Sequence, residues 1–240
     1  MQYTYLLVNF FTILIPFVFS FHPKLQFHKT WSSFFPAVFF TGLVFVLWDM
    51  LFTHLGVWGF NDRYLTGIEI GNLPVEEVLF FFCIPYACVF TFHCLDLFMG
   101  KIGGPKMQKI ISLLLLIFLL VFGIIFFSRS YTATTFLSFA LLLLFAEFVL
   151  KVNWLTRFYV IYAILLIPFF IVNGILTGSW IEEQVVWYNS EEFMNFRIGT
   201  IPVEDAFYGA ELILMNLLIY KYLLNRKKAF AASNLKTTAL

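Results

Sequence analysis

Charged residues are scarce in this sequence of 240 residues. Asp, Glu, Lys and Arg together make up 12% of the chain, whereas 61% of it is hydrophobic. A soluble domain could not cover that much apolar surface with so few polar residues. The net charge is only +1, and no stripe rich in Lys and Arg occurs before the C-terminal tail. We therefore expect an integral membrane protein and no nucleic-acid partner.

Cysteines and nucleotide-binding motifs are also few. The three cysteines, Cys83, Cys88 and Cys94, fall in one apolar segment, with no Cys-x-x-Cys spacing and no histidine placed to complete a zinc site. We interpret them as packing residues and expect no metal site. The chain contains no Gly-x-Gly-x-x-Gly and no P-loop, so no cofactor site is evident. The sequence does not decide whether a flavin or nicotinamide is required.

Long apolar runs, in contrast, are abundant. A helix needs roughly 20 residues to cross about 30 Å of hydrocarbon, and seven runs are long enough: 3–21, 34–54, 74–98, 107–127, 132–150, 158–177 and 202–224. Backbone groups in lipid must be satisfied internally, so we expect these runs to be helices. The first run follows no basic region and precedes no small-residue cleavage site, which indicates a retained span and not a signal peptide.

Basic residues are distributed unevenly between the two sides that seven spans create. Three lie on one side: Arg63, Arg129 and Arg197. Twelve lie on the other: Lys24, Lys29, Lys101, Lys106, Lys109, Lys151, Arg157, Lys221, Arg226, Lys227, Lys228 and Lys236. By the positive-inside rule we expect a multi-pass protein of the cell (inner) membrane, with the N-terminus outside and the C-terminus in the cytoplasm.

One seven-residue motif occurs twice. The copies are Gly71-Asn72-Leu73-Pro74-Val75-Glu76-Glu77 and Gly199-Thr200-Ile201-Pro202-Val203-Glu204-Asp205. Each copy ends a polar loop, 55–73 or 178–201, and begins an apolar run. Proline and acids suit the start of any helix, so capping is one interpretation. Acids at the edge of hydrocarbon are costly, however, and their presence in both copies favours a functional role.

The similarity between the two regions extends beyond the acids. Asp49 to Thr53 aligns with Asn173 to Thr177, a Gly-x-Trp ending at Trp58 or Trp180 follows each, and Phe80 aligns with Tyr208. Four spans separate the copies, so both have the same membrane orientation. We predict an all-α, polytopic membrane fold of seven transmembrane helices, built from two parallel three-helix repeats plus a linker helix. The expected divisions are a first repeat at 1–100, a linker with the fourth span at 101–131, a second repeat at 132–225 and a cytoplasmic tail at 226–240.

This symmetry limits which acids can meet. Adjacent residues on a helix point about 100° apart, so Glu76 and Glu77 cannot form a carboxyl pair by themselves, and a close pair must come from both repeats. Glu204 and Glu211 share one helix face, which should avoid lipid. We therefore expect Glu204, and by symmetry Glu76, to face the interior.

Other polar and aromatic residues of the repeat lie near the predicted acid layer. Asp49 and Asn173 are within reach of it. Capping or a hydrogen bond between helices suits Asp49 equally well and is the favoured interpretation for Asn173. Trp58 and Trp180 suit either the aromatic belt of the membrane interface or a position beside a cationic intermediate. At the other side of the membrane, Glu147 precedes Lys151 by one helical turn, which predicts a surface ion pair.

Acids in an aromatic, weakly polar pocket offer a neutral acid beside a carboxylate. That combination suits an apolar substrate that gains a proton at an alkene and loses another from a neighbouring carbon. An ion-coupled transporter is an alternative, since parallel repeats with intramembrane acids occur there too. A retinal protein is a weaker alternative, because the middle of the seventh span, 212–216, contains no lysine.

Two halves in which Pro-x-Glu-[Glu/Asp] begins an apolar helix resemble the membrane lycopene cyclases of the heterodimeric type, here fused in one chain as in the cyclase part of the fungal bifunctional enzymes. The resemblance covers nearly the whole chain. It rests on Pro74-Val75-Glu76-Glu77 followed by Phe80-Phe81-Phe82, and on Pro202-Val203-Glu204-Asp205 followed by Phe207-Tyr208.

The resemblance implies a lycopene beta-cyclase, an isomerase of the intramolecular lyase type that converts the linear ends of lycopene into β-rings, giving β-carotene through γ-carotene. It implies that Glu76, Glu77, Glu204 and Asp205 supply the acid and base groups, and that the partners are lycopene and membrane lipid. The sequence ends soon after the seventh span without a phytoene synthase region, so we do not expect the bifunctional form. Other carotenoid end-group enzymes, a hydratase or an elongase, remain alternatives, and the oligomeric state is not indicated.

Overall fold

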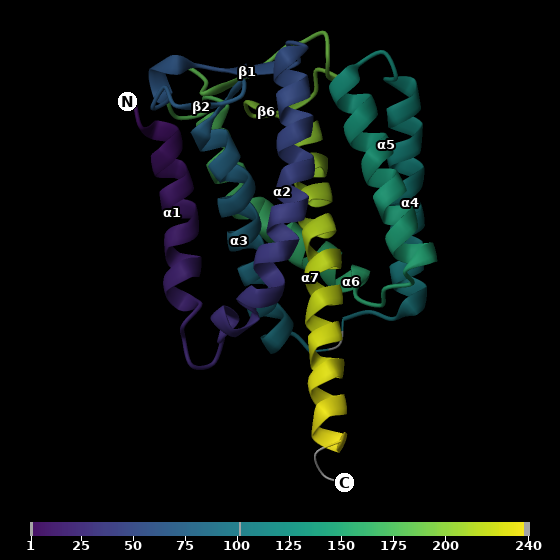
Figure 1. Ribbon diagram of the computed structural model, residues 1–240. Helices are drawn as coiled ribbons and strands as arrows, with labels where there is room; N and C mark the ends of the chain where they lie inside the picture. Colours follow the sequence, from purple (N-terminus) through teal and green to yellow (C-terminus); the bar gives the residue numbers. More distant parts are fainter. Residues whose placement is uncertain (1, 101, 238–240) are drawn as a thin grey trace.

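The computed structural model describes residues 2–100 and 102–237, with side chains as far as residue 233. Seven α-helices run through the described residues. They are α1 (Thr4–Phe19), α2 (Trp31–His54), α3 (Val75–Phe98), α4 (Pro105–Ile125), α5 (Ser130–Leu144), α6 (Leu155–Leu176) and α7 (Val203–Thr237). Figure 1 shows them as one bundle, with the N-terminus at one end and the C-terminus at the other. The predicted all-α membrane fold is confirmed.

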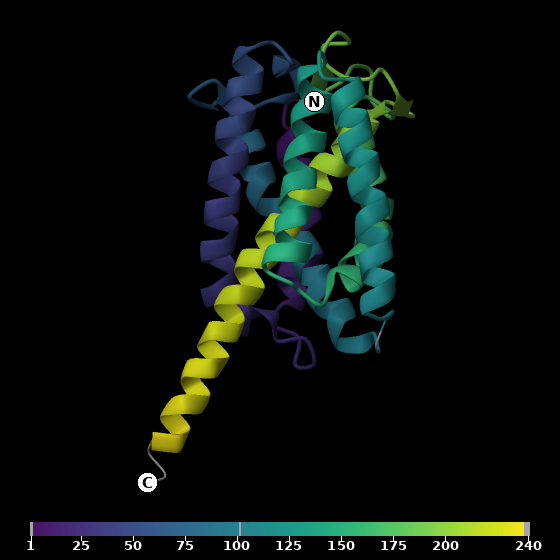
Figure 2. The same ribbon diagram turned by 90° about the vertical axis from the view of Figure 1, so that its right-hand side faces the viewer.

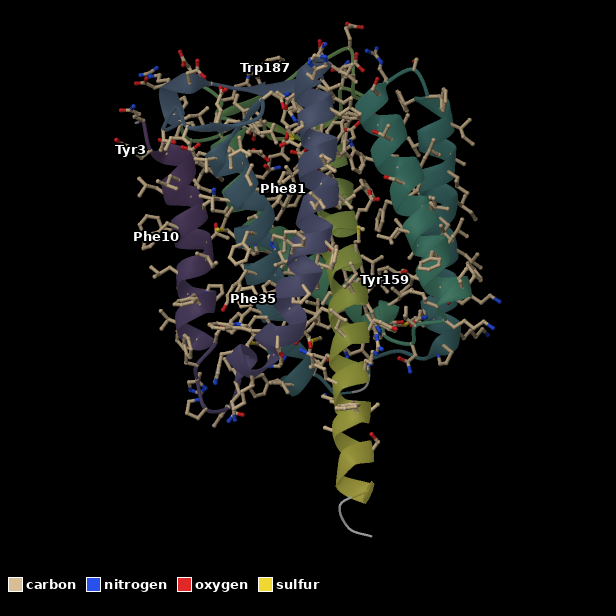
Figure 3. The ribbon with its side chains drawn as sticks, viewed as in Figure 1. Tyr3, Phe10, Phe35, Phe81, Tyr159 and Trp187 are labelled. Carbon is tan, nitrogen blue, oxygen red and sulfur yellow. The ribbon has the colours of Figure 1, made fainter. Side chains whose placement is uncertain are left out.

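The helices have the length and composition that a bilayer requires. Six helical segments of the described chain are long and apolar enough to span the membrane, and α1 is a shorter apolar helix. At 16 residues, α1 extends about 24 Å. Large apolar side chains face outwards, as Phe10 on α1 does in Figure 3, whereas Phe81 lies buried among the helices. The chain is therefore a membrane protein.

Two helix ends differ from the predicted spans. Helix α5 continues into a π-helical segment, Phe145–Val149. Helix α7 does not stop near residue 224 but continues to Thr237, so most of the segment predicted as a tail is helical. Figure 2 shows this helix crossing the bundle obliquely and extending beyond it. Residues 238–240 and Lys101, which belong to the predicted tail and linker, lie outside the described residues.

Three small antiparallel sheets cover one end of the bundle, at the top in Figure 1. The strands β1 (Trp58–Phe60) and β4 (Val186–Tyr188) pair across the two long loops, with Trp58 opposite Tyr188. Two hairpins lie beside them: β2 (Glu69–Ile70) with β3 (Leu73–Pro74), and β5 (Arg197–Ile198) with β6 (Ile201–Pro202). A short 3-10 turn, Phe27–Thr30, joins α1 to α2 at the opposite end of the bundle (Figure 1), and a second, Asp62–Tyr64, follows β1 at this end. We call this sheet-covered end the lid.

The repeated motif forms one of these hairpins in each half. Gly71 and Gly199 occupy the turns with φ of 68° and 65°, the left-handed region that glycine adopts without strain. Pro74 and Pro202 end the second strand and are buried, and the helix begins at the next residue. The backbone N–H of Val75 donates to Ile68, and that of Val203 donates to Phe196. The motif is therefore a hairpin that turns directly into a helix.

Helices α3 and α7 run through the centre of the bundle, one from each repeat. Helix α1 packs along α3 on one flank, and α5 packs along α7 on the other, with α4 outside α5 (Figure 1). Helix α2 packs against both central helices, where the Phe45 ring lies 6.1 Å from that of Phe81 and 5.0 Å from that of Tyr208. The largest buried apolar cluster includes residues of both halves.

At the end away from the lid, polar contacts join the helices. Asp96 on α3 forms ion pairs with Arg157 on α6 and Lys221 on α7. The predicted ion pair between Glu147 and Lys151 is wrong. Glu147 instead accepts hydrogen bonds from Gln108 and Ser112 of α4, at 3.0 Å each. The π-helical segment carries Glu147, so the spacing of a regular helix does not apply there.

Candidate active site

The first acid of each motif connects its helix to the loop that precedes it. Oε1 of Glu76 accepts a hydrogen bond of 2.7 Å from the backbone N–H of Thr66. Oε1 of Glu204 accepts one of 2.9 Å from the backbone N–H of Met194, the residue at the same sequence separation. The hydroxyl of Thr132 also donates to Glu204, at 2.5 Å. Both glutamates are fully buried, as expected, and they hold the lid loops onto the helices.

The second acid of each motif faces a single cavity. Glu77 and Asp205 both line it, whereas Glu76 and Glu204 do not. Glu76 and Glu204 thus face the interior, as expected, but they do not line this cavity. Neighbouring residues on a helix cannot share a face, and in both repeats the first acid points to the loop. The pair that comes from both repeats is therefore Glu77 with Asp205.

The two cavity acids differ in their hydrogen bonds. Glu77 accepts one side-chain hydrogen bond, from the hydroxyl of Tyr5. Asp205 accepts three: from Tyr131 at 2.6 Å, from the Asn173 amide at 2.6 Å and from Tyr188 at 2.9 Å. Donors aimed at a carboxylate stabilise its charged form, and three of them surround Asp205.

Asp49 completes the acidic layer. It lines the same cavity, is 1% exposed, and accepts a hydrogen bond from the indole N–H of Trp58. Asp49, Glu77 and Asp205 are all buried and line the same cavity. Carboxyl groups that share a weakly polar site disfavour each other's charged form. Such a layer can offer an acid and a carboxylate together.

Below this layer the cavity is apolar. Its volume is about 660 Å³, and it extends along α1 as far as Pro16 and along α3 as far as Thr91. Twelve residues of α1 separate Thr4 from Pro16, a distance of about 18 Å. The walls are Leu7, Val8, Phe11 and Ile15 of α1, Phe80, Ile84 and Ala87 of α3, Pro168, Phe169 and Val172 of α6, and Tyr208, Gly209 and Leu212 of α7. The site is thus a long apolar groove with acids at one end.

Aromatic rings crowd the acidic end. The ring of Tyr131 stacks on that of Tyr188 at 5.9 Å and lies edge-on to that of Trp58 at 5.0 Å. Tyr208 lies 6.2 Å from both Tyr131 and Trp58. Burial, with the negative charge of Asp205, raises the pKa of Tyr188 well above its ordinary value. The phenol therefore stays protonated and remains a hydrogen-bond donor.

The other predicted residues fall into two groups: those that reach the acidic layer and those that do not. Asn173 reaches the acid layer by its bond to Asp205, and Trp58 reaches it by its bond to Asp49. Trp180 does not: it is 65% exposed and packs over Gly174, outside the cavity. Glu211 does share a face with Glu204, since each accepts a hydrogen bond from α5, but it does not line the cavity either.

Three tyrosines at the site were not anticipated from the sequence. Tyr5 and Tyr131 occupy matching places near the start of the first helix in each repeat, and each donates to the second acid of its own half. Extending the repeat alignment to these helices would have found both. Tyr188 has no such signal, because its position depends on the pairing of β4 with β1.

Comparison with known proteins agrees with this geometry. The sequence profile of the lycopene cyclase family matches residues 2–95 and 128–223, which are the two repeats without the linker helix. A search of curated proteins and a search of solved structures each gave no match. The two matched regions cover well over half of the chain, which shows that the chain belongs to the lycopene cyclase family.

Proposed function

We propose that the chain is a lycopene beta-cyclase that converts each linear end of lycopene into a β-ring at the Glu77–Asp205 layer. Membership of the family gives lycopene cyclase activity and a lipophilic carotenoid substrate. The observation that carries the proposal is the cavity itself, because an apolar groove ends where acids from both repeats meet. A polyene fits the groove, and its reacting end meets the acids.

Glu77 is the proposed acid and Asp205 the proposed base. Glu77, with one donor, gives a proton to the terminal double bond, and the resulting cation is attacked by the next double bond to close the ring. Asp205, held as a carboxylate by three donors, removes a proton from the ring carbon beside the second cation. Return of that proton to Glu77 resets the site. Glu76, Glu204 and the two prolines position these groups through the hairpins.

The cation between the two steps needs protection from water. Trp58, Tyr131 and Tyr208 present aromatic faces near the acids, and such faces stabilise cations. The β1–β4 sheet and the loops that Glu76 and Glu204 hold cover the polar end, which limits access of water. This arrangement supports ring closure over capture of the cation as an alcohol.

The reaction as proposed balances without an oxidant or reductant. One proton enters and one leaves for each ring, so the product is an isomer of the substrate and the enzyme is an isomerase of the intramolecular lyase type. We therefore propose that neither flavin nor nicotinamide is consumed. The charge distribution of the loops supports an orientation in which the lid and the N-terminus face away from the cytoplasm.

Pigment analysis tests this function. The intact chain is expressed in bacteria that accumulate lycopene, and the carotenoids are separated and identified by absorption and mass. We expect γ-carotene and β-carotene from the intact chain and unchanged lycopene from the Asp205→Asn variant. Unchanged lycopene from the intact, folded chain would refute the proposal, and oxygenated products would indicate a hydratase.

A further inference from the structure

The two repeats supply equivalent helices, yet the cavity lies on one side only. It opens between α1 and α6, over α3 and α7. The repeat relates α1 to α5 and α6 to α2, so the symmetric cavity would lie between α5 and α2. In that position, at the lid end, Trp48 and Phe52 of α2 belong to an aromatic cluster with Tyr131 of α5. Tyr131 lies between this cluster and the cavity, which it also lines. The groove therefore follows α1 and α6, whereas aromatic rings occupy the equivalent position beside α2 and α5 at the lid end.

Differences between paired residues of the repeats account for this. When the two repeats are aligned on Asp49 and Asn173, Trp48 of α2 corresponds to Val172 of α6. Trp48 packs edge-on to Tyr208 at 5.2 Å, whereas Val172 lines the cavity. The smaller residue of this pair, Val172, therefore lies beside the open groove.

The central helices show the same difference. Counting from Glu77 and Asp205, Phe81 corresponds to Gly209, and Met215 corresponds to Ala87. Phe81 borders the cavity and packs against Phe45 of α2 at 6.1 Å, whereas Gly209 has no side chain to occupy the groove. Ala87 also lines the cavity, and the larger Met215 does not. A Cβ at Gly209 would come within 2.9 Å of the Tyr162 hydroxyl, so no side chain fits there without displacement.

The groove is open to the surroundings of the bundle. Several cavity-lining residues of α1 and α6 are also exposed, among them Phe11 at 63% and Ile171 at 54%. Both are apolar and lie within the membrane-spanning part of their helices. A hydrocarbon dissolved in the bilayer can therefore reach the groove sideways, between α1 and α6, without passing the lid.

We infer that the two halves form one reaction chamber, reached from the bilayer between α1 and α6, and that Val172, Ala87 and Gly209 provide the space for a linear polyene. This inference rests on the proposed function. One chamber with one acid layer accepts one end of the polyene at a time. The half-cyclised product must therefore leave and return with its other end first.

The test fills the groove with the side chains of the opposite repeat. Val172→Trp and Ala87→Met introduce the residues that the other repeat carries at the matching positions, and Val172→Phe is an intermediate step. Val44→Trp is the matched control, because Val44 on α2 is 45% exposed and does not line the cavity. Each variant is purified in detergent, checked for a single size-exclusion peak and assayed for cyclisation. The same groove substitutions are made in the inactive Asp205→Asn background, where lycopene that copurifies with the protein is measured.

We expect Val172→Trp to lower cyclisation by about 100-fold, since moving a reacting group by about 1 Å costs on that order. Ala87→Met and Val172→Phe should give smaller losses, and copurified lycopene should fall in the same order, while Val44→Trp resembles the intact chain. If Val172→Trp does not fold, the two milder variants decide the question. Full cyclisation and undiminished pigment in folded groove variants would overturn the inference while leaving the cyclase function standing. Failure of the intact chain to convert lycopene would instead refute the function.

Discussion

Replacing the two acids of each motif one at a time separates reaction chemistry from loop anchoring. Glu77→Gln and Asp205→Asn remove a proton donor and a proton acceptor from the cavity. Positioned acids and bases contribute about 10²- to 10⁴-fold to a rate, so each variant should lose at least about 100-fold in cyclisation. Both replacements keep the size of the side chain, and an amide oxygen still accepts from Tyr5 or Tyr131. We therefore expect both proteins to fold.

Glu76→Gln and Glu204→Gln should behave differently. Each amide retains an oxygen that accepts the backbone N–H of Thr66 or Met194. A hydrogen bond of this kind contributes about 0.5–1.5 kcal/mol and is retained in the variants, so the expected cost is at most about 1 kcal/mol of stability.

The assay measures initial rates of lycopene loss in reconstituted vesicles, normalised to folded protein, together with the temperature of unfolding. We expect the Glu76→Gln and Glu204→Gln rates to stay within about tenfold of the intact chain, with a lower unfolding temperature. The reverse pattern, in which these two variants are inactive and Glu77→Gln and Asp205→Asn cyclise normally, would refute the assignment of the cavity acids.

Three further predictions concern the same site. Tyr188→Phe removes one of the three hydrogen-bond donors to Asp205. A hydrogen bond to a charged group contributes about 1.5–3 kcal/mol, so the cyclisation rate should fall by about 10- to 100-fold. A Tyr222→Phe control on the exposed part of α7 should change nothing, and equal rates in both variants would contradict the role of Tyr188. Purified chain should convert lycopene equally with and without added reduced flavin or nicotinamide, and an absolute requirement would show that the proton balance is incomplete. In a time course with excess lycopene, the one-ring product should appear first and the two-ring product after a lag. Simultaneous appearance from the start would indicate processing without release.

The sequence was sufficient for the architecture and for the layer in which the acids lie. The doubled Gly-x-x-Pro-Val-Glu-[Glu/Asp] motif identified two parallel repeats, and the placing of Asp49 and Asn173 one helix earlier brought both to that layer. These features depend on local rules: apolar run length, helix starts and a left-handed glycine in a turn.

The sequence was not sufficient to decide which acid of each pair faces the cavity. Glu76 and Glu77 are adjacent, and the rotation of a helix about its own axis is set by the helices and loops it packs against. For the same reason, the sequence could not decide whether Trp58 or Trp180 reaches the acids. Both end a Gly-x-Trp, but only Trp58 lies on a strand that pairs across the two loops and turns it over the acids. The position of the groove on the α1–α6 side depends on small differences between repeats, such as Val172 in place of Trp48, whose effect appears only when the helices are packed.

The sharpest test is a structure of the Glu77→Gln variant with lycopene bound in lipid nanodiscs. We expect one polyene per chain, with an end between residue 77 and Asp205 and its tail leaving toward the bilayer between α1 and α6. Polyene density between α2 and α5, or two bound ends at separate acid pairs, would contradict this expectation.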